Sequence, residues 1–142
     1  MPEPDDAGPL SPLPAVGARA SREMAFTVEA VARFAALVGD HNSIHLDPEA
    51  AARTQFGRPI VHGMFVAGLI SAVIGEELPG LGSIYLGQTL RFEAPVYVGE
   101  MVAATVEVTA VRESRRIVTL RTECHNTAGV RVISGEAVVK VE

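Results

Sequence analysis

The chain has 142 residues, a length that suits one domain. Hydrophobic residues make up 48% of it, enough to bury a core, which excludes an intrinsically disordered chain. The formal net charge of -5 argues against a nucleic-acid partner, because phosphate binding needs a surplus of Lys and Arg. The single cysteine, Cys124, excludes an intramolecular disulfide and a four-cysteine zinc site, and this count fits a cytoplasmic protein.

The first 22 residues are rich in proline and glycine, which cannot continue a helix or a central strand. We therefore expect a flexible leader over residues 1–22 and a single packed domain over residues 23–142. The leader lacks the positive start and apolar run of a signal peptide. The longest apolar stretch, from Met64 to Ile74, is shorter than the roughly 20 residues that a bilayer span needs, so no membrane interaction is expected.

Two helices are predicted in the first half of the chain. Thr27 can cap the first through its hydroxyl, and Gly39 is a suitable stop. Between them, apolar residues at i, i+3, i+4 and i+7 form one stripe: Val31, Phe34, Ala35 and Val38. A second, short helix is expected from Asp47, which reads as an N-cap because Pro48 follows it, to Gly57 at the latest.

The segment from about Gly63 to Glu77 has almost no polar face, and Leu78-Pro79-Gly80 ends it. A helix that is apolar all round must be surrounded by protein. Strands follow it, because apolar and polar residues alternate over 102–110 and 118–124.

Further strands are expected near Ser83 to Phe92 and Val130 to Val141. The simplest arrangement is an α+β fold in which an antiparallel sheet wraps around the central apolar helix. Because helix and sheet together are small, we expect a homodimer that joins two sheets into one.

Polar groups concentrate between the first two helices, in Asp40-His41-Asn42-Ser43-Ile44-His45-Leu46-Asp47. Loops held by helix ends are common places for catalysis. A carboxylate and an imidazole that face one water can remove its proton and return a proton elsewhere, which is the chemistry of adding water to a polarised double bond. Without further support, Asp40 would be read as a loop charge and His45 as a loop histidine.

A second candidate element, Arg58 to Met64, enters the apolar helix. Gly63 at the helix start allows a ligand to approach the backbone closely. The free N–H groups there carry the positive end of the helix dipole and suit a developing oxyanion. His62, just before it, is by itself more typical of a structural hydrogen bond than of catalysis.

Together these elements resemble the MaoC-like family of hot-dog fold proteins. The resemblance is carried by Asp40-x-Asn42-x-x-His45-x-Asp47-Pro48 and by Gly57-Arg58-Pro59-Ile60-Val61-His62-Gly63-Met64. It continues through Pro79-Gly80-x-Gly82-Ser83-Ile84-Tyr85-Leu86-Gly87-Gln88, Phe92, Pro95-Val96 and Val98-Gly99, and closes with Gly135-Glu136-Ala137-Val138-Val139-Lys140. It covers nearly the whole chain from residue 25 and is most specific for short (R)-specific enoyl-CoA hydratases that supply polyhydroxyalkanoate synthesis.

The resemblance implies a role for each matching residue. Asp40 and His45 hold and activate the water, while Asn42 orients the site. Gly63 donates its backbone N–H to the thioester oxygen, and the acyl-CoA substrate contacts Ser71, His62 and Met64. Ser43 stands where the family usually has proline, so the loop is expected to be less rigid.

The implied reaction is syn addition of water to a trans-2-enoyl-CoA, which gives an (R)-3-hydroxyacyl-CoA. Neither a metal nor a nicotinamide cofactor is expected, because the thioester is the electron sink, and His41 with His45 lacks a clear third metal ligand. Three alternatives remain: a (3R)-hydroxyacyl-ACP dehydratase of fatty-acid synthesis, a hot-dog thioesterase, and a non-catalytic partner subunit. Hot-dog thioesterases usually present a lone carboxylate from the central helix, whereas here the only ionisable residues near that helix are Glu76 and Glu77 at its end, so the paired Asp40 and His45 favour the hydratase.

Overall fold

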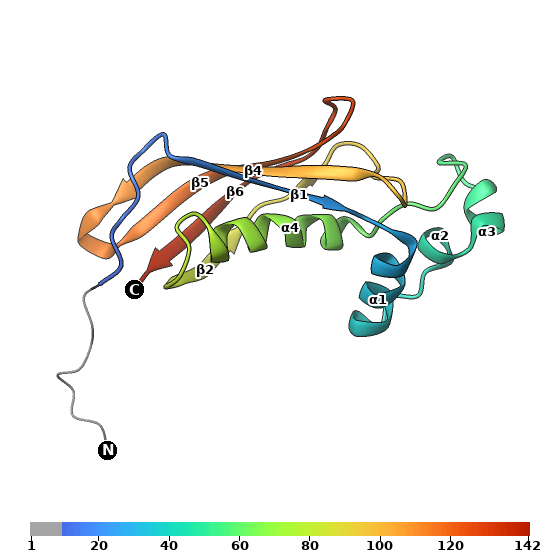
Figure 1. The fold of residues 1–142 in the computed structure, drawn as a ribbon, viewed down its shortest axis with the longest axis horizontal. Coiled ribbons are helices and arrows are strands. Elements are labelled where there is room, and N and C mark those ends of the chain that lie inside the picture. Colours follow the sequence, from blue (N-terminus) through green and yellow to red (C-terminus); the bar gives the residue numbers. More distant parts are fainter. Residues whose placement is uncertain (1–9) are drawn as a thin grey trace, which may run out of the picture.

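The computed structural model describes residues 10–142, in which one antiparallel sheet carries a long helix along one face (Figure 1). Its strands run in the order β1-β4-β5-β6-β2, and β3 also pairs with β6. The strands are β1 (Arg19–Ala25), β2 (Ser83–Gln88), β3 (Arg91–Phe92), β4 (Met101–Arg112), β5 (Ile117–Asn126) and β6 (Arg131–Val141). The helices are α1 (Val28–Val38), α2 (Ser43–Leu46), α3 (Pro48–Ala52) and α4 (Gly63–Glu76), with a 3-10 turn at Glu113–Arg115.

Helix α4 packs lengthwise on the sheet, and this contact forms the core. Its buried side chains are Val66, Leu69, Ile70, Val73 and Ile74. Every second residue of β4 from Val102 to Val108 is buried beneath them, as the alternation predicts. Cys124 on β5 belongs to the same core, and burial raises the pKa of its thiol to about 12. The predicted hot-dog arrangement, a sheet curved around a central apolar helix, is confirmed.

The opposite face of α4 is open in the single chain, so the prediction that protein surrounds the helix on all sides is wrong for one copy. Met64 is 62% exposed, and the small residues Gly68, Ser71 and Gly75 are exposed along the same side of the helix. These small residues keep that side flat. Across residues 10–142, no helix combines the length and the apolar character needed to cross a membrane.

The predicted boundary between leader and domain is also wrong. Residues 1–9 of the expected leader lie outside the described part, but strand β1 begins at Arg19 and pairs with β4 over its whole length. Gly17 already donates its N–H to the carbonyl of Val108. Sequence patterning misses this strand because β1 is an edge strand with no fully buried residue, so polar and charged side chains occupy both of its faces.

The strand predicted near Ser83 to Phe92 is divided into β2 and β3. Strand β2 bulges between Tyr85 and Gly87 where it pairs with β6. Thr89 lies at the break, and its carbonyl approaches Gly135 of β6 so closely that a Cβ on that glycine would lie 1.9 Å from the oxygen. The break directs Phe92 toward the N-terminal end of α4, where the candidate site lies.

Candidate active site

Helix α1 ends where the sequence predicts, and its end positions Asp40. The Thr27 side chain caps the helix by accepting from the Ala30 N–H at 3.1 Å, and Gly39 ends it in the left-handed conformation with φ 81°. The Asp40 carboxylate then accepts the Asn42 N–H at 3.2 Å. This hydrogen bond between residues two positions apart turns the chain immediately after the helix, so the exposed Asp40 side chain stays next to the helix end.

The segment predicted as a loop contains a short helix, α2, which carries His45. Asn42 is its N-cap and accepts the Ile44 N–H at 3.2 Å. Asp47 caps the following helix α3 by accepting from the Glu49 N–H, as predicted. Asn42 therefore acts on the backbone that presents His45, and its predicted role in orienting the site remains a prediction.

A backbone contact fixes the proton position on His45. Its Nδ1 lies 2.7 Å from the carbonyl oxygen of Ile60, in the segment that leads to α4. A carbonyl only accepts hydrogen bonds, so Nδ1 is the donor, and in the neutral ring Nε2 carries a free lone pair. A ring held in this way can accept a proton at Nε2 without moving.

His62 lies directly behind His45. The two imidazole rings are stacked with centroids 3.8 Å apart and planes inclined at 28°. His62 is 2% exposed, and its Nε2 is 3.1 Å from the Asp40 carbonyl oxygen. On its other side it contacts Phe34 of α1 at a centroid distance of 4.9 Å. His62 is thus almost wholly enclosed by protein, and its predicted contact with the substrate stays a prediction.

These groups line one cleft at the N-terminal end of α4, with a volume of about 320 Å³. Its lining residues are Phe34, Val38, Asp40, His45, His62, Gly63 and Met64. Within it, a carboxylate oxygen of Asp40 and a ring nitrogen of His45 lie within 4.8 Å of each other. One water that bonds both at about 2.8 Å fits that separation.

Gly63 and Met64 also line a neighbouring apolar cavity of about 460 Å³, between α4 and the segment around β3. Gly63 is the first residue of α4, where backbone N–H groups have no partner within the helix. A Cβ on this residue would lie 2.6 Å from the ring of Phe92. A side chain at this position would therefore make Phe92 or the start of α4 move where the polar cleft and the apolar cavity meet.

Ser71 is separate from these groups. It lies two turns further along α4 on the exposed side, and neither of the two cavities is lined by it. Its predicted contact with substrate stays a prediction. Met64, in contrast, lines both cavities with an exposed side chain.

His41 and His45 have no clear third metal ligand near them in the sequence, whereas the fold brings His62 next to His45. Asp40, His45 and His62 each offer an atom within 4.8 Å of the others. However, a metal binds imidazole in the ring plane at about 2.0–2.1 Å. Stacked rings direct their lone pairs side by side instead of toward a common point, and one nitrogen of each ring already faces a carbonyl oxygen. This geometry does not suit an ion.

Sequence reasoning missed how the two polar segments join. The contacts of His45 with Ile60 and of His62 with Asp40 connect residues 15 and 22 positions apart. The sequence offers only a weak signal for them, namely a histidine directly before an apolar helix.

The chain is thus a hot-dog domain with a paired aspartate and histidine at the N-terminal end of its central helix. Residues 13–129 match the family model described as MaoC like domain. The (R)-specific enoyl-CoA hydratase of Aeromonas caviae is 53% identical over 126 residues, which are 89% of this chain and 94% of that protein. The 3-hydroxybutyryl-CoA dehydratase of Methylorubrum extorquens is 49% identical over 111 residues, with 78% and 70% covered.

Among solved structures, the (R)-hydratase from A. caviae involved in PHA biosynthesis superposes with a TM-score of 0.88 at 52% identity. That match covers 90% of this chain and 97% of the other. The chain belongs to the MaoC-like family.

Proposed function

We propose that the protein is an (R)-specific enoyl-CoA hydratase, which adds water to a trans-2-enoyl-CoA. The observation that carries this proposal is the shared cleft of Asp40, His45 and Gly63. Two groups able to bind and deprotonate a water there face the start of a helix whose N–H groups stabilise negative charge. The names of the related hydratases support the same reaction.

In the proposed reaction, the water lies between Asp40 and His45. Its oxygen bonds to C3 while a proton passes to the pair, with His45 Nε2 as the free acceptor. The C2–C3 π electrons move toward the thioester oxygen, which the Gly63 N–H stabilises. The pair then returns a proton to C2 on the same face, so one water is added in total. The thioester serves as the electron sink, and we propose that neither a metal nor a nicotinamide takes part.

A purified preparation tests this directly. Incubation with crotonyl-CoA should reduce the absorbance of the enoyl thioester, and chiral analysis should identify (R)-3-hydroxybutyryl-CoA. Release of free thiol would instead indicate a thioesterase. Activity only on acyl-carrier-protein thioesters would indicate the fatty-acid dehydratase, and no turnover of either substrate would indicate a non-catalytic subunit.

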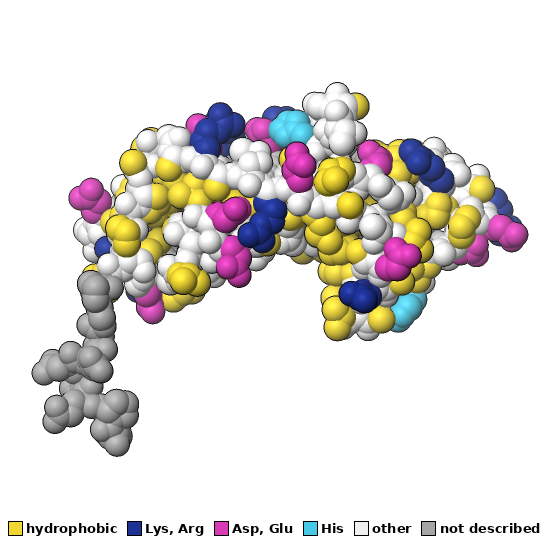
Figure 2. Space-filling model, viewed as in Figure 1, with side chains coloured by type: hydrophobic (Ala, Val, Ile, Leu, Met, Phe, Trp, Pro, Cys, Tyr) yellow, Lys and Arg dark blue, Asp and Glu magenta, His cyan; other side chains and the backbone are white. Residues whose placement is uncertain are grey.

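We also propose a homodimer. The exposed side of α4, the edge strand β2 and the end of α1 present apolar side chains to solvent, among them Met64, Leu86 and Leu37. Figure 2 shows hydrophobic side chains gathered on the underside of the molecule, over α4 and α1. A second copy that pairs along β2 would cover this surface and extend the sheet. Light scattering coupled to size-exclusion chromatography should give twice the mass of the 15.0 kDa chain.

For its setting, we propose the cytoplasm, with the (R)-3-hydroxyacyl-CoA product drawn into polyhydroxyalkanoate synthesis. The related hydratase whose structure is described as involved in PHA biosynthesis supports this setting. Polymer content in a host that expresses the protein together with a polyhydroxyalkanoate synthase tests it. Unchanged polymer content, with active enzyme present, would contradict it.

A further inference from the structure

One buried ionisable side chain has no part in the proposed reaction. Within the described residues, the buried polar side chains are His62 and Thr122. Thr122 has an ordinary structural role, since its hydroxyl accepts from the Gln88 amide at 3.0 Å. His62 is bonded at Nε2 only, and its buried Nδ1 has no hydrogen-bond partner.

An unpartnered buried nitrogen costs stability. Phenylalanine or leucine would fill the same space without that cost. The reason for a histidine here must therefore lie in the two contacts that only an imidazole provides. These are an N–H for the Asp40 carbonyl and a flat polar ring stacked on His45.

Both contacts act on the pair that holds the water. Nε2 of His62 faces a carbonyl, so it carries the proton and donates to the residue that bears the carboxylate. The His62 ring stacks on the His45 ring, and the Ile60 carbonyl holds Nδ1 at the edge of the His45 ring. His62 is also the N-cap residue of α4, so it precedes Gly63 directly.

We infer that His62 is a positioning residue, which keeps the Asp40 carboxylate and the His45 ring within reach of one water at a fixed distance from the start of α4. This inference rests on the proposed hydration. It assigns His62 no contact with the reacting atoms.

Three substitutions separate the two contacts. His62→Phe keeps a ring beneath His45 but loses the N–H, and His62→Gln keeps an N–H donor but loses the ring. His62→Leu loses both. We expect kcat on crotonyl-CoA to fall by about a hundredfold in His62→Leu and about tenfold in the other two, with little change in KM, as misplacement of reacting groups predicts. The matched control, Thr122→Val, alters the other buried polar residue and should lower Tm without lowering kcat.

A readout independent of activity accompanies the kinetics. In protein labelled with ¹⁵N-histidine, the ring nitrogens of His45, assigned with His45→Gln, should show one fixed tautomer with Nδ1 protonated. In His62→Leu these signals should become averaged between tautomers, whereas in Thr122→Val they should not.

Folded His62→Leu protein with wild-type kcat and an unchanged His45 spectrum would overturn the inference. If His62→Leu does not fold, wild-type kcat in both His62→Phe and His62→Gln overturns it. If the wild-type protein itself does not hydrate crotonyl-CoA, the proposed function fails, and the His45 spectrum still tests whether His62 fixes the ring.

Discussion

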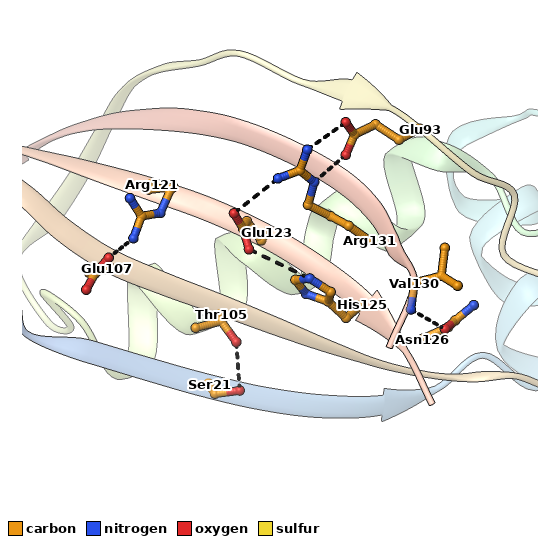
Figure 3. Close-up of polar contacts among 10 residues, drawn as sticks. All are labelled: Ser21, Glu93, Thr105, Glu107, Arg121, Glu123, His125, Asn126, Val130 and Arg131. Carbon is orange, nitrogen blue, oxygen red and sulfur yellow. Dashed lines mark hydrogen bonds and ion pairs between the residues drawn. The ribbon is translucent and has the colours of Figure 1, made fainter. Parts of the chain in front are cut away.

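The helical end of the molecule and the outer face of its sheet hold polar groups in opposite ways. On the sheet, Arg131 bonds Glu93 at 2.6 and 3.0 Å and also lies 3.6 Å from Glu123 (Figure 3). Arg121 pairs with Glu107 on the same face. The sheet face has more charges, yet these charges are partly exposed and already paired.

At the helical end the polar groups are fewer. They come from separate segments and meet next to the buried ring of His62. Asp40 and His45 both line the cleft, and a backbone group bonds one oxygen of Asp40 and one nitrogen of His45, which leaves the second oxygen and the second nitrogen for a water. The comparison indicates that unpaired, convergent groups make a site, whereas density of charge does not. Four predictions test this difference, in order of decreasing effect.

Loss of either member of the water-binding pair should abolish most activity. Asp40→Asn or His45→Gln should reduce kcat by about 10²- to 10⁴-fold, as general acid–base groups do. Thermal melting should change little, because Asp40 is exposed and His45 is only half-buried. Asp47→Asn is the matched control, since asparagine can still cap α3 and kcat should be unchanged. Near-normal turnover in either pair variant would refute the assigned roles.

A methyl group at the helix start should disturb the site by contact. In Gly63→Ala the new Cβ would press on Phe92, so Phe92 or the start of α4 must move. We expect kcat/KM to fall about tenfold. In a Phe92→Ala background, where the contact is gone, Gly63→Ala should lower kcat/KM by less than it does in the wild type. A double variant with no recovery would show that the contact with Phe92 is not the cause.

The polar contact beneath β2 should matter for stability and not for turnover. Gln88→Leu removes the donor to the buried Thr122 hydroxyl and should lower the free energy of unfolding by about 1–3 kcal/mol, measured in urea. The double variant Gln88→Leu with Thr122→Val should lose less than the sum of the two single variants, because both partners are then apolar. Additive losses would mean that the two side chains are not coupled.

The smallest effect is expected on the sheet face. The hydrogen bond from Arg131 lowers the pKa of Glu93 below its ordinary value of 4.5. A lowered pKa means that this carboxylate stabilises the fold above pH 4.5 and that its contribution is lost as the pH falls through the folded-state value. Glu93→Gln should therefore melt at a slightly lower temperature than the wild type at about pH 7, and the difference in Tm should shrink as the pH falls through the folded-state pKa. A difference in Tm that grows toward acid would contradict this sign.

Much of the fold follows from local patterns, because caps and alternation act between near neighbours. Thr27, Gly39 and Asp47 start and stop helices where the sequence predicts, and strands β4 and β5 contain the two stretches in which apolar and polar residues alternate. Edge strand β1 is the exception, because Arg22 lies between Ala20 and Met24 on its core-facing side and interrupts the apolar alternation.

Residue types and their spacing are enough to predict that an apolar helix and a long antiparallel sheet pack together, and that an aspartate and a histidine lie in one short loop before that helix. How the loop is held becomes clear only from the folded chain: the Ile60 carbonyl fixes the proton on His45, and the His62 ring stacks against His45 and bonds the Asp40 carbonyl. Contacts between segments far apart in the chain depend on how the helices dock on the sheet. Residue type and spacing carry no direct record of that docking, which is why a histidine before an apolar helix does not by itself reveal its neighbours.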